Sequence, residues 1–300
     1  MTAPRIQKLE PFGPGGTAAA TSLALWPEIP ASALAAGKPV QRGHYYLEDK
    51  ARGLTAGVWD CTAMTEKGGP YSVNEFMILL EGEVTIIEAP KNVPSPPARS
   101  RSDRRDAGEG GAPSGRAGEG AAQAEPRRTT FRAGESFIIP KGLPCQWHQD
   151  GYVRKFFVIF DDASGMVPPD PAALAPLRPD PRADLAPSAG PAPELLLRGA
   201  PQQRDKRYYA DLTGQWTVGV WSSTPYHRKT IPFPRHELMH ILEGEVTITE
   251  EGQPPRTFKA GDTFVVPMGT LCDWKSTVDI RKFYCIMQPK AEAAGVKAAE

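Results

Sequence analysis

Short β-branched and aromatic runs, each closed by turn-forming residues, dominate the hydrophobic pattern of this chain. Residues 84–87 and 246–249 alternate Val, Ile and Thr, while residues 137–140 and 264–267 are apolar runs that end in Pro-x-Gly turns. Runs of this length and composition are typical of strands. The pattern predicts an all-β fold of antiparallel sandwich or barrel type, with no more than a turn or two of helix.

The same pattern occurs twice. Residues 75–84, which read EFMILLEGEV, return as ELMHILEGEV at 237–246, and the FRAG of residues 131–134 returns as FKAG at 258–261. A repeat this long indicates two copies of one domain. We therefore predict two tandem barrels, at residues 37–162 and 199–290, and a chain of 300 residues is long enough for both.

Four segments lie outside the repeat. Residues 1–36 form an N-terminal arm without a convincing counterpart in the second copy, residues 163–198 form a Pro/Ala-rich linker, and residues 291–300 form a C-terminal tail. The first copy also carries an insertion at about residues 94–128, made almost entirely of Pro, Gly, Ala, Ser, Arg and Glu. Such a segment buries too little apolar surface to offset its ordering entropy, so we expect a disordered loop on a hairpin.

Charge and composition exclude several partner classes. The chain has 35 Lys and Arg against 35 Asp and Glu, so its overall field favours neither nucleic acid nor a membrane surface. It shows neither an apolar run of about 20 residues nor a secretory signal pattern. Its four cysteines are not closely paired, which argues against a zinc ribbon or a disulfide framework. We expect a cytoplasmic protein.

The repeated motifs resemble those of the cupin superfamily. Glu237 with residues 241–246 is similar to the second half of the first cupin motif, and residues 261–272 are similar to the second motif. Both motifs recur in the first copy, so the chain resembles a bicupin, in which two jelly-roll barrels lie in tandem. The tryptophan after each motif cysteine and a closing Arg-Lys pair resemble the branch that contains (S)-ureidoglycine aminohydrolase and the ethanolamine-utilisation cupins.

The resemblance implies a metal site that the sequence does not supply. Metal-binding cupins place two histidines five and seven residues before the motif glutamate and a third histidine in the second motif. These positions hold other residues in both copies: Gly68, Pro70 and Cys145, and Thr230, Pro232 and Cys272. One carboxylate and one thiol fall short of the three or so matched ligands that a catalytic ion needs. We expect no metal cofactor, and a metal-dependent cupin with atypical ligands is the alternative.

Residues 236–240 spell HELMH, which matches the zinc-protease signature HExxH. That motif requires a helix, where the two histidines lie one turn apart on one face. Here the segment continues into a predicted strand, where residues four apart are about 13 Å from each other. The first copy has neither histidine at the equivalent positions, Asn74 and Ile78. We therefore interpret the match as coincidental.

Glu237 and Glu75 are the candidate catalytic residues. Strand alternation places them on the same face as Met239 and Met77, which in a cupin is the barrel interior. A carboxylate there must find a partner or raise its pKa. It is then a general acid or base, a ligand-binding group, or a structural group paired with a nearby lysine or backbone amide.

The remaining candidates are pocket residues. They are Cys145, Trp147 and Lys155 in the first copy with Met77, and Cys272, Trp274, Lys282 and His227 in the second copy with Met239. Each cysteine is either a pocket thiol or a small apolar core residue, and the latter is commoner. Each lysine can supply a cation for an anionic ligand, although its face cannot be read through the preceding turn. His227 is the imidazole expected nearest the mouth of the second barrel.

These features predict a bicupin that binds, and in one reading transforms, a small polar metabolite. The resemblance implies nitrogen-compound metabolism and, for an enzyme, hydrolysis of a carbon–nitrogen bond. The alternative is a non-catalytic sensing or assembly protein. Pairing of exposed sheet edges would give a homodimer.

Overall fold

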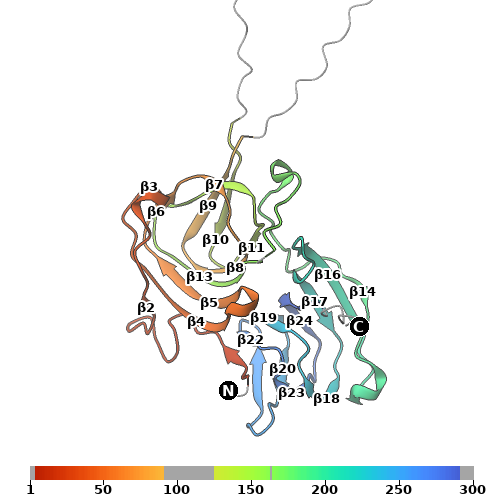
Figure 1. Ribbon diagram of the computed structural model, residues 1–300. Coiled ribbons are helices and arrows are strands. Elements are labelled where there is room, and N and C mark those ends of the chain that lie inside the picture. The colour runs from red at the N-terminus through yellow and green to blue at the C-terminus, as the bar shows by residue number, and fades with distance from the viewer. Residues whose placement is uncertain (1–3, 91–124, 163, 291–300) are drawn as a thin grey trace, which may run out of the picture.

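The computed structural model describes residues 4–90, 125–162 and 164–290. Figure 1 shows two barrels side by side, the first in orange to yellow-green and the second in cyan to blue. The described residues form strands and four three-residue 3-10 helices: η1 (Ala31–Ala33), η2 (Lys50–Arg52), η3 (Pro171–Ala173) and η4 (Pro193–Leu195). None of these helices has the length that a membrane crossing requires. The all-β prediction is confirmed.

The first barrel consists of two antiparallel sheets. The larger sheet has the order β11 (Ser136–Ile139), β8 (Asn74–Glu81), β13 (Val153–Phe160), β5 (Leu54–Cys61), β4 (Gln41–Asp49) and β2 (Ala24–Leu25). The smaller sheet has the order β10 (Arg128–Arg132), β9 (Glu83–Glu88), β12 (Pro144–Gln149), β6 (Met64–Glu66) and β3 (Leu34–Ala36), with β7 (Gly69–Pro70) paired to β12.

The second barrel repeats this arrangement. Its larger sheet has the order β1 (Gln7–Lys8), β22 (Thr263–Val266), β19 (His236–Glu243), β24 (Ile280–Met287), β17 (Trp216–Ser223), β16 (Gln203–Ala210) and β14 (Ala186–Ser188). Its smaller sheet has the order β15 (Leu196–Arg198), β18 (His227–Pro232), β23 (Leu271–Lys275), β20 (Glu245–Ile248) and β21 (Arg256–Lys259).

The insertion of the first copy lies in a hairpin, as its position predicts. Strands β9 and β10 pair antiparallel with Ile87 opposite Arg128. Arg128 is therefore a strand residue rather than the last residue of a loop. The predicted disorder at about 94–128 concerns residues that lie mostly outside the described ranges.

The two larger sheets pack against each other through their outer faces. Side chains alternate along each of these strands, so that one face points into its own barrel and the other toward the neighbouring barrel. Both faces are apolar because both are buried. Phe76 of β8 meets Phe283 of β24 with ring centroids 6.2 Å apart. The buried cluster at this interface includes Val58, Ile78 and Val158 from the first barrel and Val218, Val220 and Leu238 from the second. Separate clusters fill the two barrel interiors.

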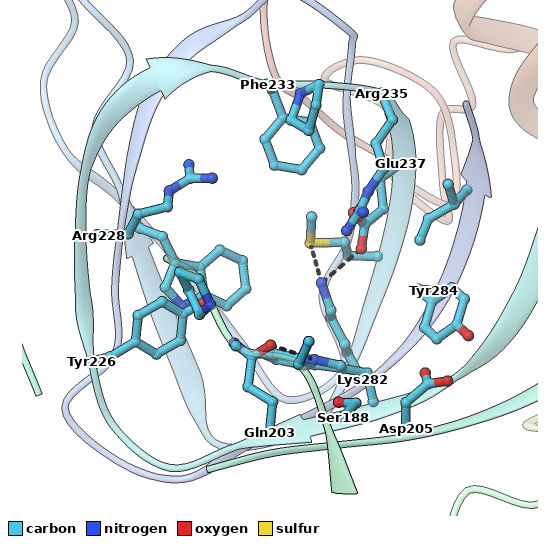
Figure 2. A pocket seen from close by; sticks show the side chains of 18 of the residues that line it. Ser188, Gln203, Asp205, Tyr226, Arg228, Phe233, Arg235, Glu237, Lys282 and Tyr284 are labelled. Atoms are coloured by element: carbon cyan, nitrogen blue, oxygen red, sulfur yellow. Dashed lines mark hydrogen bonds and ion pairs between the residues drawn. The ribbon is translucent and has the colours of Figure 1, made fainter. Parts of the chain in front are cut away.

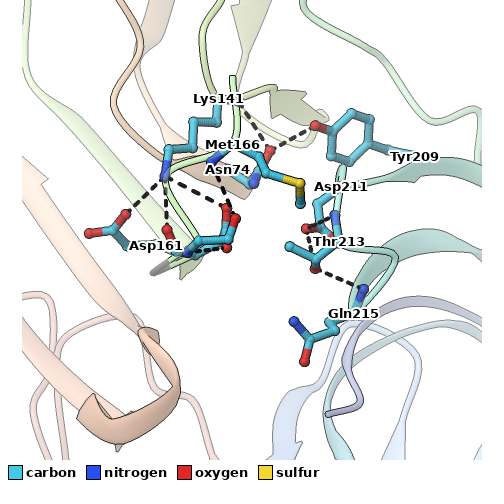
Figure 3. Close-up of polar contacts among 10 residues, drawn as sticks. Asn74, Lys141, Asp161, Met166, Tyr209, Asp211, Thr213 and Gln215 are labelled. Atoms are coloured by element: carbon cyan, nitrogen blue, oxygen red, sulfur yellow. Dashed lines mark hydrogen bonds and ion pairs between the residues drawn. The ribbon is translucent and has the colours of Figure 1, made fainter. Parts of the chain in front are cut away.

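Polar contacts border this interface (Figure 3). The Tyr209 hydroxyl of the second barrel donates to Asn74 Oδ1 of the first at 2.7 Å. The same oxygen accepts a hydrogen bond from the Lys141 amide at 3.1 Å, and the Lys141 ammonium lies 3.3 Å from the Asp161 carboxylate. These contacts fix the ends of β8 and β16 against each other.

The arm before each barrel crosses to the other barrel. Strand β1 of the N-terminal arm pairs with β22, where Gln7 lies opposite Val265. In the linker, Leu177 forms the matching bridge to Ile138 of β11. Ion pairs repeat the match: Lys8 lies 2.7 Å from Asp262, and Arg178 lies 3.0 Å from Glu135.

The arm and the linker are therefore equivalent elements, although the sequence comparison assigns the arm no counterpart. The correspondence continues through β2 and β14 and through β3 and β15, which pair with equivalent strands in their own barrels. Few identical residues mark it, because these strands are two or three residues long and rely mainly on backbone pairing.

Candidate functional site in the second barrel

The second barrel contains a cavity of about 420 Å³. This volume is within the range of small-molecule sites. Its wall comes from β16, β17, β18, β19, β23 and β24 and from the linker between Ser188 and Leu195. Five charged side chains line it: Asp205, Arg228, Arg235, Glu237 and Lys282. Figure 2 shows them around one central space.

Glu237 is an ionised carboxylate held by two cations. It lies on β19 with 1% of its surface exposed. Its Oε1 accepts a hydrogen bond from Lys282 Nζ at 2.7 Å, and its Oε2 accepts one from Arg235 Nε at 2.9 Å. Burial alone would raise the pKa of this carboxyl, but the two cations outweigh it and hold the pKa of Glu237 below its ordinary value. Glu237 is therefore poorly suited to donate a proton at neutral pH.

Lys282 lies in a cage of four groups. Besides Glu237, its ammonium lies 3.1 Å from Met239 Sδ. It also faces the rings of Trp221 and Trp274, with 4.8 and 5.0 Å to their centroids. Indole faces attract cations through the ring quadrupole. Burial lowers the pKa of Lys282, and the charge of Glu237 opposes that shift.

The first barrel contains the same cage. Lys155 Nζ lies 2.8 Å from Glu75 Oε1 and 3.2 Å from Met77 Sδ. The rings of Trp59 and Trp147 lie 4.8 and 4.5 Å from it. We call each set of Glu, Lys, Met and two Trp a lysine cage. The structure brings the predicted catalytic glutamate of each copy together with the predicted pocket residues Met, Trp and Lys. Trp59 and Trp221 complete the cages and were not among the predicted site residues.

The surroundings of the two cages differ in charge. Arg228 and Arg235 line the second cavity, whereas the first copy has Glu66 and Val73 at these positions. In the first barrel the second carboxylate oxygen of Glu75 accepts a hydrogen bond from the Tyr71 hydroxyl instead of an arginine. Three cations and two carboxylates line the second cavity.

Aromatic side chains fill the corresponding space of the first barrel. Trp26 stacks on Tyr45 with centroids 4.8 Å apart and meets the edge of Phe157 at 6.2 Å. Trp26 also lies over Gly43, where an added Cβ would come within 2.3 Å of its ring. The second barrel has Ser188, Arg207, Tyr284 and Asp205 at these four positions. Exchange of the tryptophan for serine leaves room for the cavity.

Arg228 has the clearest unmet binding capacity in this cavity. Its Nη2 donates to the Cys272 carbonyl at 3.1 Å, but no carboxylate of the described residues lies within ion-pair distance of it. Its Nε and the Trp274 Nε1 are buried without a hydrogen-bond partner among those residues. Buried donors normally have partners. The guanidinium as a whole lines the cavity without a carboxylate partner among the described residues, so a bound anion would supply one.

Figure 2 shows Arg228 and Arg235 on either side of Phe233. Both guanidinium carbons lie 5.9 Å from the centre of that ring. The two arginines and the Lys282 ammonium thus surround one face of the cavity with positive charge. Arginine side chains bind carboxylates through paired N–H donors, so this face suits an anion.

The cysteines and His227 lie outside the cavity wall. Cys272 and Cys145 are buried, and burial raises the pKa of Cys272 to about 11 and that of Cys145 to about 12. Both therefore remain protonated core thiols at neutral pH. The His227 ring lies 3.3 Å from the Asp273 carboxylate and lines a separate surface depression with Leu197. Cys272 and His227, which the sequence analysis gives as pocket residues, are thus not among the residues that line this cavity.

The HExxH segment lies on strand β19, as the sequence predicts. Glu237 faces the barrel, whereas His236 lies 3.2 Å from Asp49 of the first barrel. His240 Nδ1 is 2.8 Å from the Thr263 hydroxyl, and burial lowers the pKa of His240 to about 4. The two imidazoles thus have separate partners on the other face of the strand.

The residues of the second cavity do not fit the divalent metal that the cupin resemblance implies. Both oxygens of Glu237 are ion-paired within the chain, and two cations beside it would repel a third. Across the described ranges, no group of three His, Cys, Asp or Glu side chains could hold a metal ion. Lys282 occupies the position on Glu237 that a cation would take.

Sequence reasoning missed Arg228, Arg235 and Asp205. A signal was present, since Glu66 and Arg228 occupy equivalent positions with opposite charge. Comparison of the two copies for identity overlooks such a reversal. The space that Ser188 leaves open, where the first copy has Trp26, was also not predicted. Both residues lie in segments that show no repeat by sequence identity.

Comparison with known proteins supports the fold. Residues 211–284 match the model of the EutQ-like cupin domain. A protein of unknown function from Pseudomonas syringae pv. tomato, assigned to the DUF861 family, is 24% identical, with a TM-score of 0.66 over 95% of this chain and 100% of its own. The fold is a tandem cupin.

Two further structures share less. Protein Ylba from Escherichia coli, also assigned to DUF861, is 11% identical with a TM-score of 0.47, over 97% of this chain and 94% of its own. A putative ethanolamine utilization protein Q from Salmonella typhimurium is 19% identical with a TM-score of 0.26, over 30% of this chain and 72% of its own. No curated protein matches the sequence.

Proposed function

We propose that this tandem cupin binds a small anionic metabolite in the second barrel. The observation that carries the proposal is Arg228, a cavity-lining cation without an ion-pair partner among the described residues. The first barrel supports the assignment by contrast, because Glu66 replaces the arginine and Trp26 fills the space. A carboxylate is the simplest anion that satisfies a guanidinium in this setting.

The geometry favours binding over catalysis by Glu237. An ionised, doubly ion-paired carboxylate does not serve as a general acid, and its low pKa makes it a weak base. The resemblance to the aminohydrolase and ethanolamine-utilisation cupins adds nitrogen-compound metabolism as the setting. Hydrolysis of a carbon–nitrogen bond by this protein remains a prediction from that resemblance, and release of ammonia from candidate substrates would test it.

Calorimetric titration with malonate, succinate and pyruvate tests the proposal. We expect Arg228→Gln to weaken binding about 10- to 100-fold, since hydrogen bonds to charged groups contribute about 1.5–3 kcal/mol. The matched control is Lys229→Gln, which removes the same charge from the same strand at an exposed position. Equal affinity in wild type and Arg228→Gln would refute the assignment of the anchor. Failure of all three probes to bind wild-type protein would refute the proposed function.

A further inference from the structure

We propose that Lys282 replaces the metal ion of this barrel: its ammonium holds an oxygen of the bound anion, and binding needs no divalent cation. This inference rests on the proposed function, because it assigns a second anchor to the same ligand. A cupin barrel without metal ligands would in this way still present a cation to its ligand.

The cage has the character of a cation site. Lys282 Nζ contacts a carboxylate oxygen at 2.7 Å, a thioether sulfur at 3.1 Å and two indole faces. Each of these groups is electron-rich toward the ammonium. The lysine therefore holds a positive charge on the motif glutamate, where the cupin resemblance places a metal.

The ammonium keeps one donor for a ligand. A lysine ammonium has three N–H groups. Glu237 and Met239 accept two of them, and no third acceptor is found among the described residues. Lys282 lines the cavity, and Figure 2 shows its end in the central space below Arg228 and Arg235. An anion bound by Arg228 would thus meet a second fixed cation.

The first barrel separates this binding role from a structural one. Its cage has the same five residue types, with contacts that agree to within about half an ångström. There, Trp26, Tyr45 and Phe157 fill the corresponding space. A stabilising role alone would leave the ligand affinity of the folded protein unchanged when either lysine is replaced, whereas a binding role makes only Lys282 matter for the ligand.

The test compares Lys282→Met with the matched control Lys155→Met in calorimetric titrations of malonate and pyruvate, with and without EDTA. We expect Lys282→Met to weaken binding at least tenfold. We expect Lys155→Met to leave binding unchanged in protein that remains folded, and EDTA to have no effect on the wild type. If Lys282→Met does not fold, the double variant Glu237→Gln/Lys282→Met leaves no carboxylate charge without its lysine and provides the same comparison.

The outcomes distinguish the two proposals. Loss of binding in Arg228→Gln with unchanged binding in Lys282→Met would overturn the inference and leave the proposed function intact. Loss of wild-type binding in EDTA, restored by added Mn²⁺ or Zn²⁺, would also overturn the inference. If no probe binds wild-type protein at all, the proposed function fails and the inference fails with it.

Discussion

Replacing the lysine of each cage by methionine should destabilise the two barrels unequally. Lys155→Met leaves Glu75, which is 3% exposed, with the neutral Tyr71 hydroxyl as its only side-chain hydrogen-bond partner among the described residues. Lys282→Met leaves Glu237 with Arg235, whose Nε stays 2.9 Å from Oε2. The arginine is thus the difference between the two perturbations.

The magnitudes follow from this difference. Removal of one partner from a buried ion pair costs about 3–5 kcal/mol when the other charge is left uncompensated, and we expect this loss for Lys155→Met. Loss of one of two charged hydrogen bonds costs about 1.5–3 kcal/mol, and we expect this smaller loss for Lys282→Met. The double variant Glu75→Gln/Lys155→Met should recover most of the first loss, since no buried charge remains.

Urea unfolding measures the loss of unfolding free energy for each variant. Amide exchange at β13 and β24 shows which barrel is destabilised. Far-UV circular dichroism of the folded variants serves as the control for gross misfolding. A larger loss for Lys282→Met than for Lys155→Met would refute the reasoning, because Glu237 has Arg235 as an additional cation. A loss below about 1 kcal/mol for both would show that neither cage holds a buried ion pair.

Three further predictions concern the arm, the acid stability and the cysteines. Ile6 is 3% exposed and packs against the second barrel, so Ile6→Ala should lower the free energy of unfolding by about 2–5 kcal/mol and speed amide exchange in β22 more than in β11. The control Leu25→Ala, at a position that is 70% exposed, should change little. Equal acceleration of exchange in both strands would contradict the crossed arm. The folded state holds the pKa of Glu237 below its ordinary value, so ionised Glu237 stabilises the fold above about pH 4.5, and this contribution is lost as pH falls through the folded pKa. The difference in unfolding free energy between wild type and Glu237→Gln should therefore shrink in acid. A difference that stays constant with pH would be contrary evidence. With thiol pKa values of about 11 for Cys61 and Cys272 and about 12 for Cys145, folded protein should react slowly with Ellman's reagent at pH 8 and rapidly in urea, and fast reaction in the folded state would contradict the burial.

Much of the fold follows from local sequence pattern. The β-branched runs became β9 and β20, and strand alternation placed Glu237 on the same face as Met239, where both line the cavity. Such features depend only on strand period and turn chemistry, which short windows of sequence contain. Two copies at fixed offsets gave independent support for each strand.

The crossed arms and the lysine cages depend on contacts between distant segments. Pairing of Gln7 with Val265 spans most of the chain, and two-residue strands leave little periodic signal. Lys282 lies opposite Ile241 across the paired strands β19 and β24, and this register cannot be read from either strand alone. Which residues surround each lysine can be seen only once the strands are paired.

The cavity was hidden for a different reason. Its existence depends on what the second copy lacks, namely the Trp26, Tyr45 and Phe157 cluster of the first. Identity between the copies draws attention to shared residues such as the cages. The features that separate a filled barrel from an open one lie at positions where the copies differ.

A structure determined from crystals of the whole chain that have been soaked in malonate would test the central claim most directly. The account predicts a carboxylate of malonate on the Arg228 guanidinium in the second barrel, within hydrogen-bond distance of Lys282 Nζ, and no metal on Glu237. Malonate bound in the first barrel, or a metal ion coordinated by Glu237 with Lys282 displaced, would contradict it.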